Sequence, residues 1–211
     1  MEDTRRKLLA LLQRSGQAAV EELARELGLA AASVRRHLDI LQRDHLVTFR
    51  VVRKKTGRPE YAFLLTEQGQ ESLPKNYDWL LRLLVEEVSS LGMGEVSSRD
   101  GKALSQLLLT RAADRLTDGY KAALDGNLEN QLSTLLQLLQ QSDFSPEVER
   151  DGEKLCIRLV NCPFRSIALA SGEICLFDQR LIANFLGSAV DQEQCIQQGD
   201  PGCCYMVWLT T

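Results

Sequence analysis

The amino-acid sequence predicts an α+β protein made of three consecutive segments. Residues 3–44 carry apolar side chains at helical spacing, and residues 46–65 hold two β-prone runs around a glycine-containing turn. Residues 77–143 are helical in pattern, and the rest of the chain mixes short strands with helices. We therefore expect segments at 1–76, 77–143 and 144–211, the last of mixed α/β type.

The first segment begins with three predicted helices. The first covers residues 3–15, where four leucines stand among three arginines and a lysine. The second ends at Gly28, which is the residue type expected just after a helix C-terminus. The third runs to about Asp44 and has three residues on one apolar face: Val34, Leu38 and Leu41.

A β-hairpin follows these helices. Residues 46–53 and 60–65 are rich in β-branched and aromatic side chains, and the turn at 54–59 between them is basic. Thr66 is expected to cap a short helix, and Pro74 to close the segment.

The middle segment predicts helices over 77–91, 102–124 and 127–141, with a loop from Gly92 to Gly101. Leucines of the third helix have a spacing that suits a coiled-coil seam between two chains, and it suits internal core packing equally well. These leucines are Leu128, Leu132, Leu135 and Leu139. We expect this segment to contribute to dimerisation.

The last segment predicts three strands and two helices. Pro163 suits the first position of one helix and Ser171 the N-cap of the other. The strands are expected at 154–160, 190–197 and 203–209, and the helices at 163–170 and 172–186. Residues 142–151 are expected to form a loop or an edge strand.

Charge is unevenly distributed along the chain. The net charge is −4, but residues 1–60 hold 13 Lys and Arg against 8 Asp and Glu, giving +5. Residues 61–211 hold 12 against 21, giving −9. The basic segment therefore suits a polyanionic partner. No run of about twenty uncharged apolar residues occurs, and the first residues lack a signal-peptide pattern, so we expect a cytoplasmic chain.

Three helices followed by a basic hairpin are the plan of a winged helix-turn-helix, whose third helix enters the major groove of DNA. We therefore expect double-stranded DNA as a partner. His45, near the end of the third helix, is expected to be structural. The candidate contacts are Ser33, Arg35, Arg36 and His37 on the helix and Arg53, Lys54, Lys55 and Arg58 on the hairpin.

The third-helix region resembles a known group of regulators. Residues 27–29 (Leu-Gly-Leu) and 33–38 (Ser-Val-Arg-Arg-His-Leu) look like the recognition segment of ArsR/DeoR-like winged-helix proteins. A narrower resemblance is to the SufR group of iron–sulfur-sensing repressors, carried by Gly57-Arg58-Pro59-Glu60-Tyr61, Leu65-Thr66, Gly69, Pro74 and Tyr77. One departure is Ala30, where a Ser or Thr cap is common; its absence costs about 1 kcal/mol of helix stability.

All six cysteines follow position 155. Cys162, Cys175 and Cys203 are separated by 12 and 27 residues, a spacing that resembles the SufR group and implies ligation of a [4Fe-4S] cluster. Cys162 and Cys175 lie at predicted helix starts, which are expected to lower thiol pKa values, and Cys203 begins a strand.

The fourth ligand stays open between Cys195 and Asp178, and Cys156 and Cys204 are expected to be core residues. Two alternatives remain for the three proposed ligands. They could be unrelated buried cysteines, or they could form a structural zinc site, although zinc sites commonly contain close Cys-x-x-Cys pairs that this chain lacks.

The resemblance implies a homodimeric repressor that binds a palindromic operator of iron–sulfur cluster assembly genes. We expect no membrane partner, no small-molecule substrate and no enzymatic activity, because no glycine-rich nucleotide motif or nucleophile–base pair is evident. Two alternative functions are a winged-helix regulator that senses oxidants or an organic ligand, and a redox or iron–sulfur carrier protein.

Overall fold

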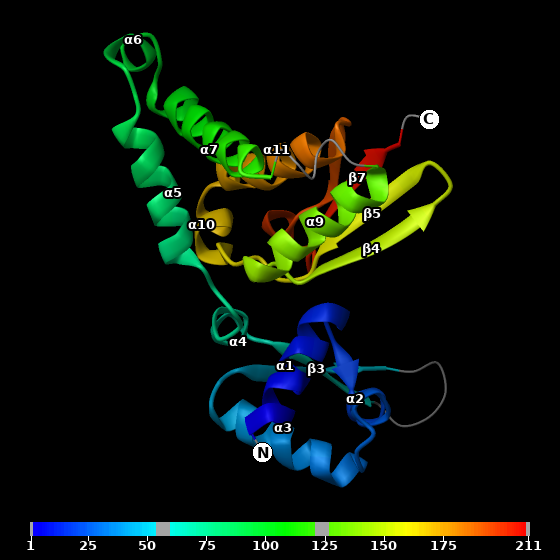
Figure 1. Ribbon diagram of the computed structural model, residues 1–211. Helices are drawn as coiled ribbons and strands as arrows, with labels where there is room; N and C mark the ends of the chain where they lie inside the picture. Colours follow the sequence, from blue (N-terminus) through cyan, green and yellow to red (C-terminus); the bar gives the residue numbers. More distant parts are fainter. Residues whose placement is uncertain (1, 54–59, 121–126, 210–211) are drawn as a thin grey trace. The chain divides into compact units, whose positions relative to one another are not determined.

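The computed structural model describes residues 2–53, 60–120 and 127–209 (Figure 1). The chain forms two compact units, Met1–Pro74 and Lys75–Thr211. The predicted α+β class is confirmed, with a winged helix-turn-helix at the N-terminus. Helices expected in the middle segment share one core with the strands of the last segment, as the buried residues Leu109, Leu135 and Tyr205 show.

The N-terminal unit consists of helices and one small antiparallel sheet with the strand order β1-β3-β2. The short strand β1 was not predicted; it forms because Ala18 and Ala19 pair with Phe63 and Ala62. The elements are α1 (Glu2–Ser15), β1 (Ala18–Ala19), α2 (Val20–Leu27), α3 (Ala31–Arg43), β2 (Val47–Val52), β3 (Glu60–Leu65) and α4 (Glu67–Glu71).

Local sequence signals explain the ends of these helices. Gly28 follows α2 with a φ of 64°, a left-handed conformation that glycine adopts without strain. The Thr66 hydroxyl oxygen accepts a hydrogen bond from the Gly69 N–H at 3.0 Å and caps α4, as predicted. A Cβ at Gly69 would lie 1.9 Å from the carbonyl oxygen of Leu46, so only glycine allows this approach. Ala30 offers no side-chain cap to α3.

The C-terminal unit contains most of the helices and a second sheet. Its first helices are α5 (Tyr77–Ser89), α6 (Met93–Val96), α7 (Gly101–Asp118) and α9 (Leu128–Gln141). The remaining elements are β4 (Pro146–Asp151), β5 (Lys154–Leu159), α10 (Arg165–Ala170), η1 (Gly172–Ile174), α11 (Cys175–Leu186), β6 (Val190–Gln194), η2 (Ile196–Gln198) and β7 (Cys203–Trp208).

Three expectations for this unit need correction. The region predicted as a loop from Gly92 to Gly101 contains the short helix α6. The Ser171 side chain caps no backbone N–H, and its hydroxyl group donates to Glu173 instead. As a result the chain passes through the 3-10 turn η1, and the regular helix α11 begins only at Cys175.

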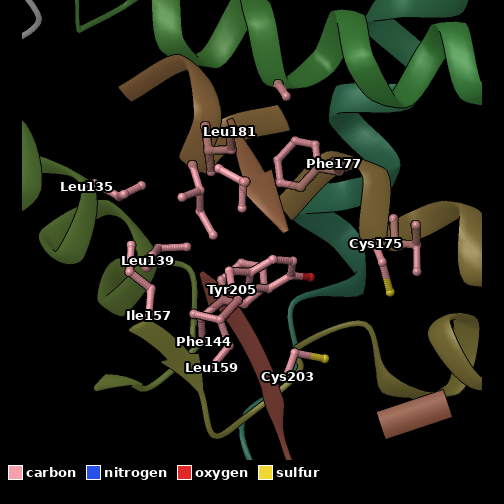
Figure 2. Close-up of a cluster of buried hydrophobic side chains, with 14 of the residues drawn as sticks. Leu135, Leu139, Phe144, Ile157, Leu159, Cys175, Phe177, Leu181, Cys203 and Tyr205 are labelled. Carbon is pink, nitrogen blue, oxygen red and sulfur yellow. The ribbon is translucent and has the colours of Figure 1, made fainter. Parts of the chain in front are cut away.

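The four-stranded antiparallel sheet has the order β4-β5-β7-β6. One face, which includes Ile157 and Tyr205, packs against helical side chains such as Leu135 and Leu139 (Figure 2). Of the two alternatives for the α9 leucines, internal packing is therefore the one observed for Leu135 and Leu139.

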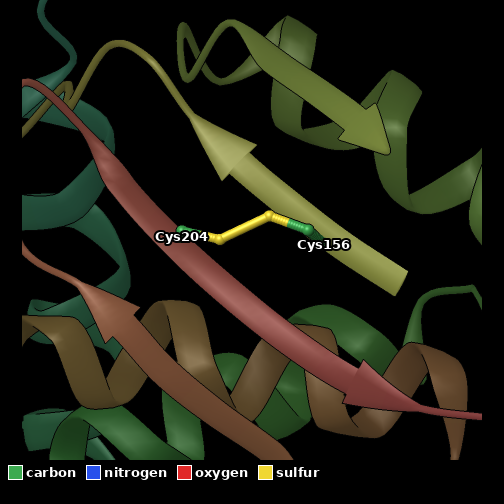
Figure 3. Close-up of a disulfide and its surroundings, with 2 residues drawn as sticks. All are labelled: Cys156 and Cys204. Atoms are coloured by element: carbon green, nitrogen blue, oxygen red, sulfur yellow. A yellow bond between two sulfur atoms is a disulfide. The ribbon is translucent and has the colours of Figure 1, made fainter. Parts of the chain in front are cut away.

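The other face of the sheet carries a disulfide between Cys156 on β5 and Cys204 on β7 (Figure 3). Their Cα atoms are 6.4 Å apart because the two residues are diagonal neighbours in the ladder. We predicted two core cysteines, which holds for Cys204 at 4% exposed, whereas Cys156 is half-buried. The bond between them was not predicted; side chains alternate along β7, so Cys204 shares its face of the sheet with Trp208.

Reduction of this disulfide is expected to lower the free energy of unfolding of the metal-free chain by about 2–4 kcal/mol, because the bond closes a loop across 48 residues. Urea unfolding with and without dithiothreitol measures the change. The Cys156→Ser variant serves as the control, since its stability should not respond to the reductant. An equal response in both proteins would contradict the prediction.

Candidate DNA-binding surface and cysteine site

The recognition surface is the outer side of α3. Val34, Leu38 and Leu41 are buried and fix the inner side of this helix in the core of the N-terminal unit. The opposite side leaves Ser33, Arg35 and Arg36 exposed and His37 half-buried. The helix therefore presents polar and cationic groups in the way that contact with a major groove requires.

The basic side chains of this surface have different surroundings. Arg35 forms an ion pair with Glu21 of α2 at 2.9 Å, and both side chains are more than half exposed, so the pair holds Arg35 only weakly. Among the described residues Arg36 has no ion-pair partner, which leaves its guanidinium group available to DNA. The His37 Nδ1 atom is buried and, within the same residues, has no hydrogen-bond partner.

The structure describes only part of the wing, which is the hairpin formed by β2 and β3. Arg53 is exposed at the end of β2, whereas Lys54, Lys55 and Arg58 lie outside the described residues. Arg50, which the sequence reasoning did not select, is also exposed on β2 and donates to the Gln17 side chain at 2.5 Å. The signal that points to Arg50 is its position in a basic hairpin strand. His45 ends the α3 region with a φ of 59°, which fits the structural role predicted for it.

The candidate cysteine site lies at the end of the strand pair β5–β7. Cys203 pairs with Leu159, three residues before Cys162. Gly202 makes this approach possible, because a Cβ at that position would lie only 2.8 Å from the Leu159 carbonyl oxygen. Cys175 and Cys203 lie at one edge of the buried cluster, and the Tyr205 hydroxyl points to the same side (Figure 2).

The four free cysteines lie close enough to affect one another. The thiol of Cys175 interacts electrostatically with Cys162, Cys195 and Cys203. Cys162 is half-buried, and the other three are buried. Charges on Cys162, Cys195 and Cys203 therefore act on the Cys175 thiol, although the four residues come from separate parts of the sequence.

Burial controls the ionisation of these thiols. It raises the pKa of Cys162 and Cys175 well above the ordinary range and that of Cys203 to about 12. We expected helix N-termini to lower these pKa values. That expectation was wrong because desolvation outweighs the helix dipole at buried sites. The Phe164 N–H, bonded to the Cys162 sulfur, and the Ile196 N–H, bonded to the Cys203 sulfur, lower the pKa by less.

Asp178 and Tyr205 belong to the same region. Asp178 is 5% exposed, and burial raises the pKa of its carboxyl group to about 7. The Tyr205 hydroxyl donates to its Oδ2 atom at 3.3 Å, while the Oδ1 atom has no hydrogen-bond partner in the described part of the chain. Sequence reasoning missed Tyr205, although period-two alternation on β7 places it on the same face as Cys203.

The donor arrangement separates two kinds of metal centre. Within residues 2–53, 60–120 and 127–209, no three His, Cys, Asp or Glu side chains are placed to bind one metal ion together. A zinc site would need all of its ligands about 2.3 Å from one ion. In a [4Fe-4S] cluster each ligand binds a different iron, so the ligands surround a larger volume. Such a group fits the three thiols, two of which accept N–H···S hydrogen bonds, and the Asp178 oxygen that lacks a partner.

Comparison with known proteins gives a family match for part of the N-terminal unit. Residues 1–48 match the family described as winged helix-turn-helix DNA-binding. A search of curated proteins gave no match. Among solved structures, the crystal structure of Bacillus subtilis PadR in complex with operator DNA is similar at 18% identity. The match covers 89% of this chain and 93% of that chain, with a TM-score of 0.32.

No helix in the described ranges is long and apolar enough to cross a membrane.

The family match agrees with the order of α1, β1, α2, α3 and the wing strands, and with the cationic outer side of α3. The N-terminal unit is therefore a winged helix-turn-helix DNA-binding domain.

Proposed function

We propose that this chain is a homodimeric repressor that binds a palindromic operator under the control of a [4Fe-4S] cluster. Cys162, Cys175 and Cys203 hold the cluster, and the regulated genes are those of iron–sulfur cluster assembly. The gathering of these three thiols around one region that includes Asp178 carries the proposal. Repression and the target genes rest on the resemblance of the sequence to the SufR group.

The residues of the site couple cluster binding to local order. When bound, the cluster supplies iron that takes up thiolates, so the three buried thiols must release their protons. The Phe164 and Ile196 N–H groups then donate to thiolate sulfurs, which accept hydrogen bonds more strongly than thiols do. With thiolates at these positions, the two N–H groups would hold the segment that follows Cys162 and the turn that precedes Cys203 more tightly.

A chain of contacts leads from Cys162 to the start of the C-terminal unit. The Asn76 N–H donates to the Pro163 carbonyl oxygen at 3.2 Å, directly beside Cys162. Trp79 of α5 stacks on Phe164 with ring centroids 6.0 Å apart. Because Asn76 follows closely on the last residue of the DNA-binding unit, order at Cys162 reaches the segment that joins the two units. This connection supports control of operator binding by the site.

An exposed apolar stripe on α5 supports the homodimer. Leu81, Val85 and Val88 are 62%, 54% and 53% exposed and follow i, i+4, i+7 spacing, so they form one line along the helix. Such a line on the outside of a packed unit marks an interaction surface. We name these three residues the α5 stripe.

Charges beside the α5 stripe favour a second copy of the chain as its partner. Arg82 and Glu86 are exposed and lie on α5 next to the stripe, and neither has an ion-pair partner among the described residues. In an antiparallel pair of α5 helices related by a two-fold axis near Leu84, Arg82 of one copy lies opposite Glu86 of the other. The surface is therefore complementary to itself in both apolar character and charge.

Replacing Cys162 with serine tests the proposed sensor. The anaerobically reconstituted wild-type chain is expected to be brown and to contain iron and sulfide, whereas Cys162→Ser loses the colour and the cluster-dependent part of its operator affinity. Visible absorption, iron and sulfide analysis and gel-shift titration measure this. Cys156→Ser, which changes a cysteine on the outer face of the sheet, should keep both properties. Undiminished iron and operator binding in Cys162→Ser would refute the assignment.

The DNA-binding surface has its own test. Arg36→Ala is expected to change the sequence preference, with a loss of about 1–3 kcal/mol at one base position, because Arg36 lies on the recognition helix. Lys54→Ala, in the basic turn, is expected to weaken binding to all sequences about equally and to reduce the salt dependence of binding. Binding titrations to an operator library at several salt concentrations separate the two effects. Equal, small losses on all sequences from both variants would contradict the assignment of α3.

The Cys156–Cys204 disulfide favours a second candidate function, a winged-helix regulator that senses oxidants without a cluster. Such a protein would contain no iron after anaerobic isolation, and peroxide would change its operator affinity. Cys156→Ser would then abolish the response to peroxide, whereas under the cluster proposal this variant behaves like the wild type.

A further inference from the structure

We infer that the Asp178 carboxylate is the fourth ligand of the cluster, binding through its Oδ1 atom. This inference rests on the proposed function and deepens it. Asp178 is 5% exposed, and its Oδ1 atom has no hydrogen-bond partner among the described residues. A buried carboxylate oxygen without a partner is costly in a folded protein, and binding a metal is one way in which that cost is removed.

The position of Asp178 fits this role. It lies three residues after Cys175 on α11, so the two side chains are on the same face of the helix, one turn apart. Asp178 also interacts electrostatically with Cys162, Cys175 and Cys203. The Asp178 charge therefore raises the pKa of all three proposed thiolate ligands.

Tyr205 prepares the carboxylate for this role. Its hydroxyl donates to Asp178 Oδ2 at 3.3 Å and thereby leaves Oδ1 as the unused oxygen. The Gln192 side-chain amide donates in turn to the Tyr205 hydroxyl oxygen at 3.3 Å. Groups that hold a ligand by hydrogen bonds in this way orient it and tune its affinity for metal.

Cys195, the other candidate, has a different role. Its thiol is hydrogen-bonded to Cys203, and its backbone N–H donates to Asp200 Oδ2 at 2.9 Å. Cys195 therefore supports the Cys203 sulfur through this hydrogen bond. A carboxylate is a harder ligand than a thiolate and is less suited to iron in a sulfide cluster. The iron bound to Asp178 is consequently the one that the cluster loses most readily.

The test compares variants reconstituted anaerobically with iron and sulfide. Asp178→Ala and the isosteric Asp178→Asn are expected to lower the iron content from about four to about three per chain, with sulfide unchanged. Asp178→Cys is expected to keep about four irons and to lose the first iron to a chelator about tenfold more slowly than the wild type. Cys195→Ser, which removes the rival fourth ligand, should keep the iron content of the wild type. Metal analysis and electron paramagnetic resonance of each sample give the readout.

Two results would overturn the inference while leaving the proposed function intact. One is about four irons and an unchanged rate of iron loss in both Asp178→Ala and Asp178→Asn. The other is a loss of one iron in Cys195→Ser. A wild-type chain that takes up no iron and sulfide at all would instead overturn the proposed function, and this inference with it. Circular dichroism of each metal-free variant verifies that the readout comes from folded protein.

Discussion

Replacing Glu87 with alanine is expected to lower the free energy of unfolding by about 3–5 kcal/mol. The Glu87 side chain is 1% exposed and forms ion pairs with Arg111, at 3.0 Å, and with Arg115. Removing the carboxylate leaves two guanidinium groups of α7 without the buried negative charge that they face. The loss of a buried partner is among the largest effects that a single substitution produces.

The size of this effect reflects a network rather than a single pair. Arg111 also forms an ion pair with Glu95 of α6 at 2.8 Å and donates to the Ser90 hydroxyl oxygen at 2.9 Å. The network joins α5, α6 and α7, and it fixes the helix that carries the α5 stripe. Glu87→Gln should be milder than Glu87→Ala, because the amide oxygen still accepts hydrogen bonds from arginine.

An exposed ion pair of the same unit provides the comparison. Arg150 and Glu129 are 3.3 Å apart with side chains 52% and 72% exposed, so Glu129→Ala is expected to cost about 0–1 kcal/mol. Urea unfolding followed by circular dichroism gives both values. If the two variants lost similar amounts of stability, the Glu87 network would have no special structural role.

The N-terminal unit could be predicted from sequence because its signals are local. A few neighbouring residues determine the buried and exposed faces of α3, the end of α2 at Gly28 and the cap at Thr66. The strand β1 was not predicted, because two alanines have no β-strand pattern by themselves. They form a strand only because β3 offers them a partner.

For the cysteine site, the sequence could only suggest which cysteines belong to it. Spacing and resemblance selected Cys162, Cys175 and Cys203, and their ligation of a cluster stays a prediction. Their raised pKa values were not predictable, because the degree of burial is a tertiary property that outweighs the helix-end effect. The Cys156–Cys204 disulfide was missed for a related reason, since it depends on the register between β5 and β7.

Placing an arginine at Val85 is expected to convert the proposed homodimer to a monomer of 23.7 kDa and to lower operator affinity by about 10²–10⁴-fold. Val85 is 54% exposed in the centre of the α5 stripe, so the new charge should leave the fold of the single chain intact. In the dimer it would be buried near the two-fold axis opposite its own copy, where like charges repel. A single chain reaches only one half-site and loses the gain from binding two at once. Sedimentation and operator titration measure the two changes.

Exchange of the neighbouring charges distinguishes the proposed antiparallel pairing from general surface damage. Arg82→Glu and Glu86→Arg should each weaken the dimer, because each variant places like charges opposite one another across the two-fold axis. The double exchange restores opposite charges and should therefore recover most of the dimer affinity, a coupling that independent sites do not show. If the double variant were as weak as the sum of the single variants, or if Val85→Arg remained a dimer, the two chains would associate through a surface other than the α5 stripe.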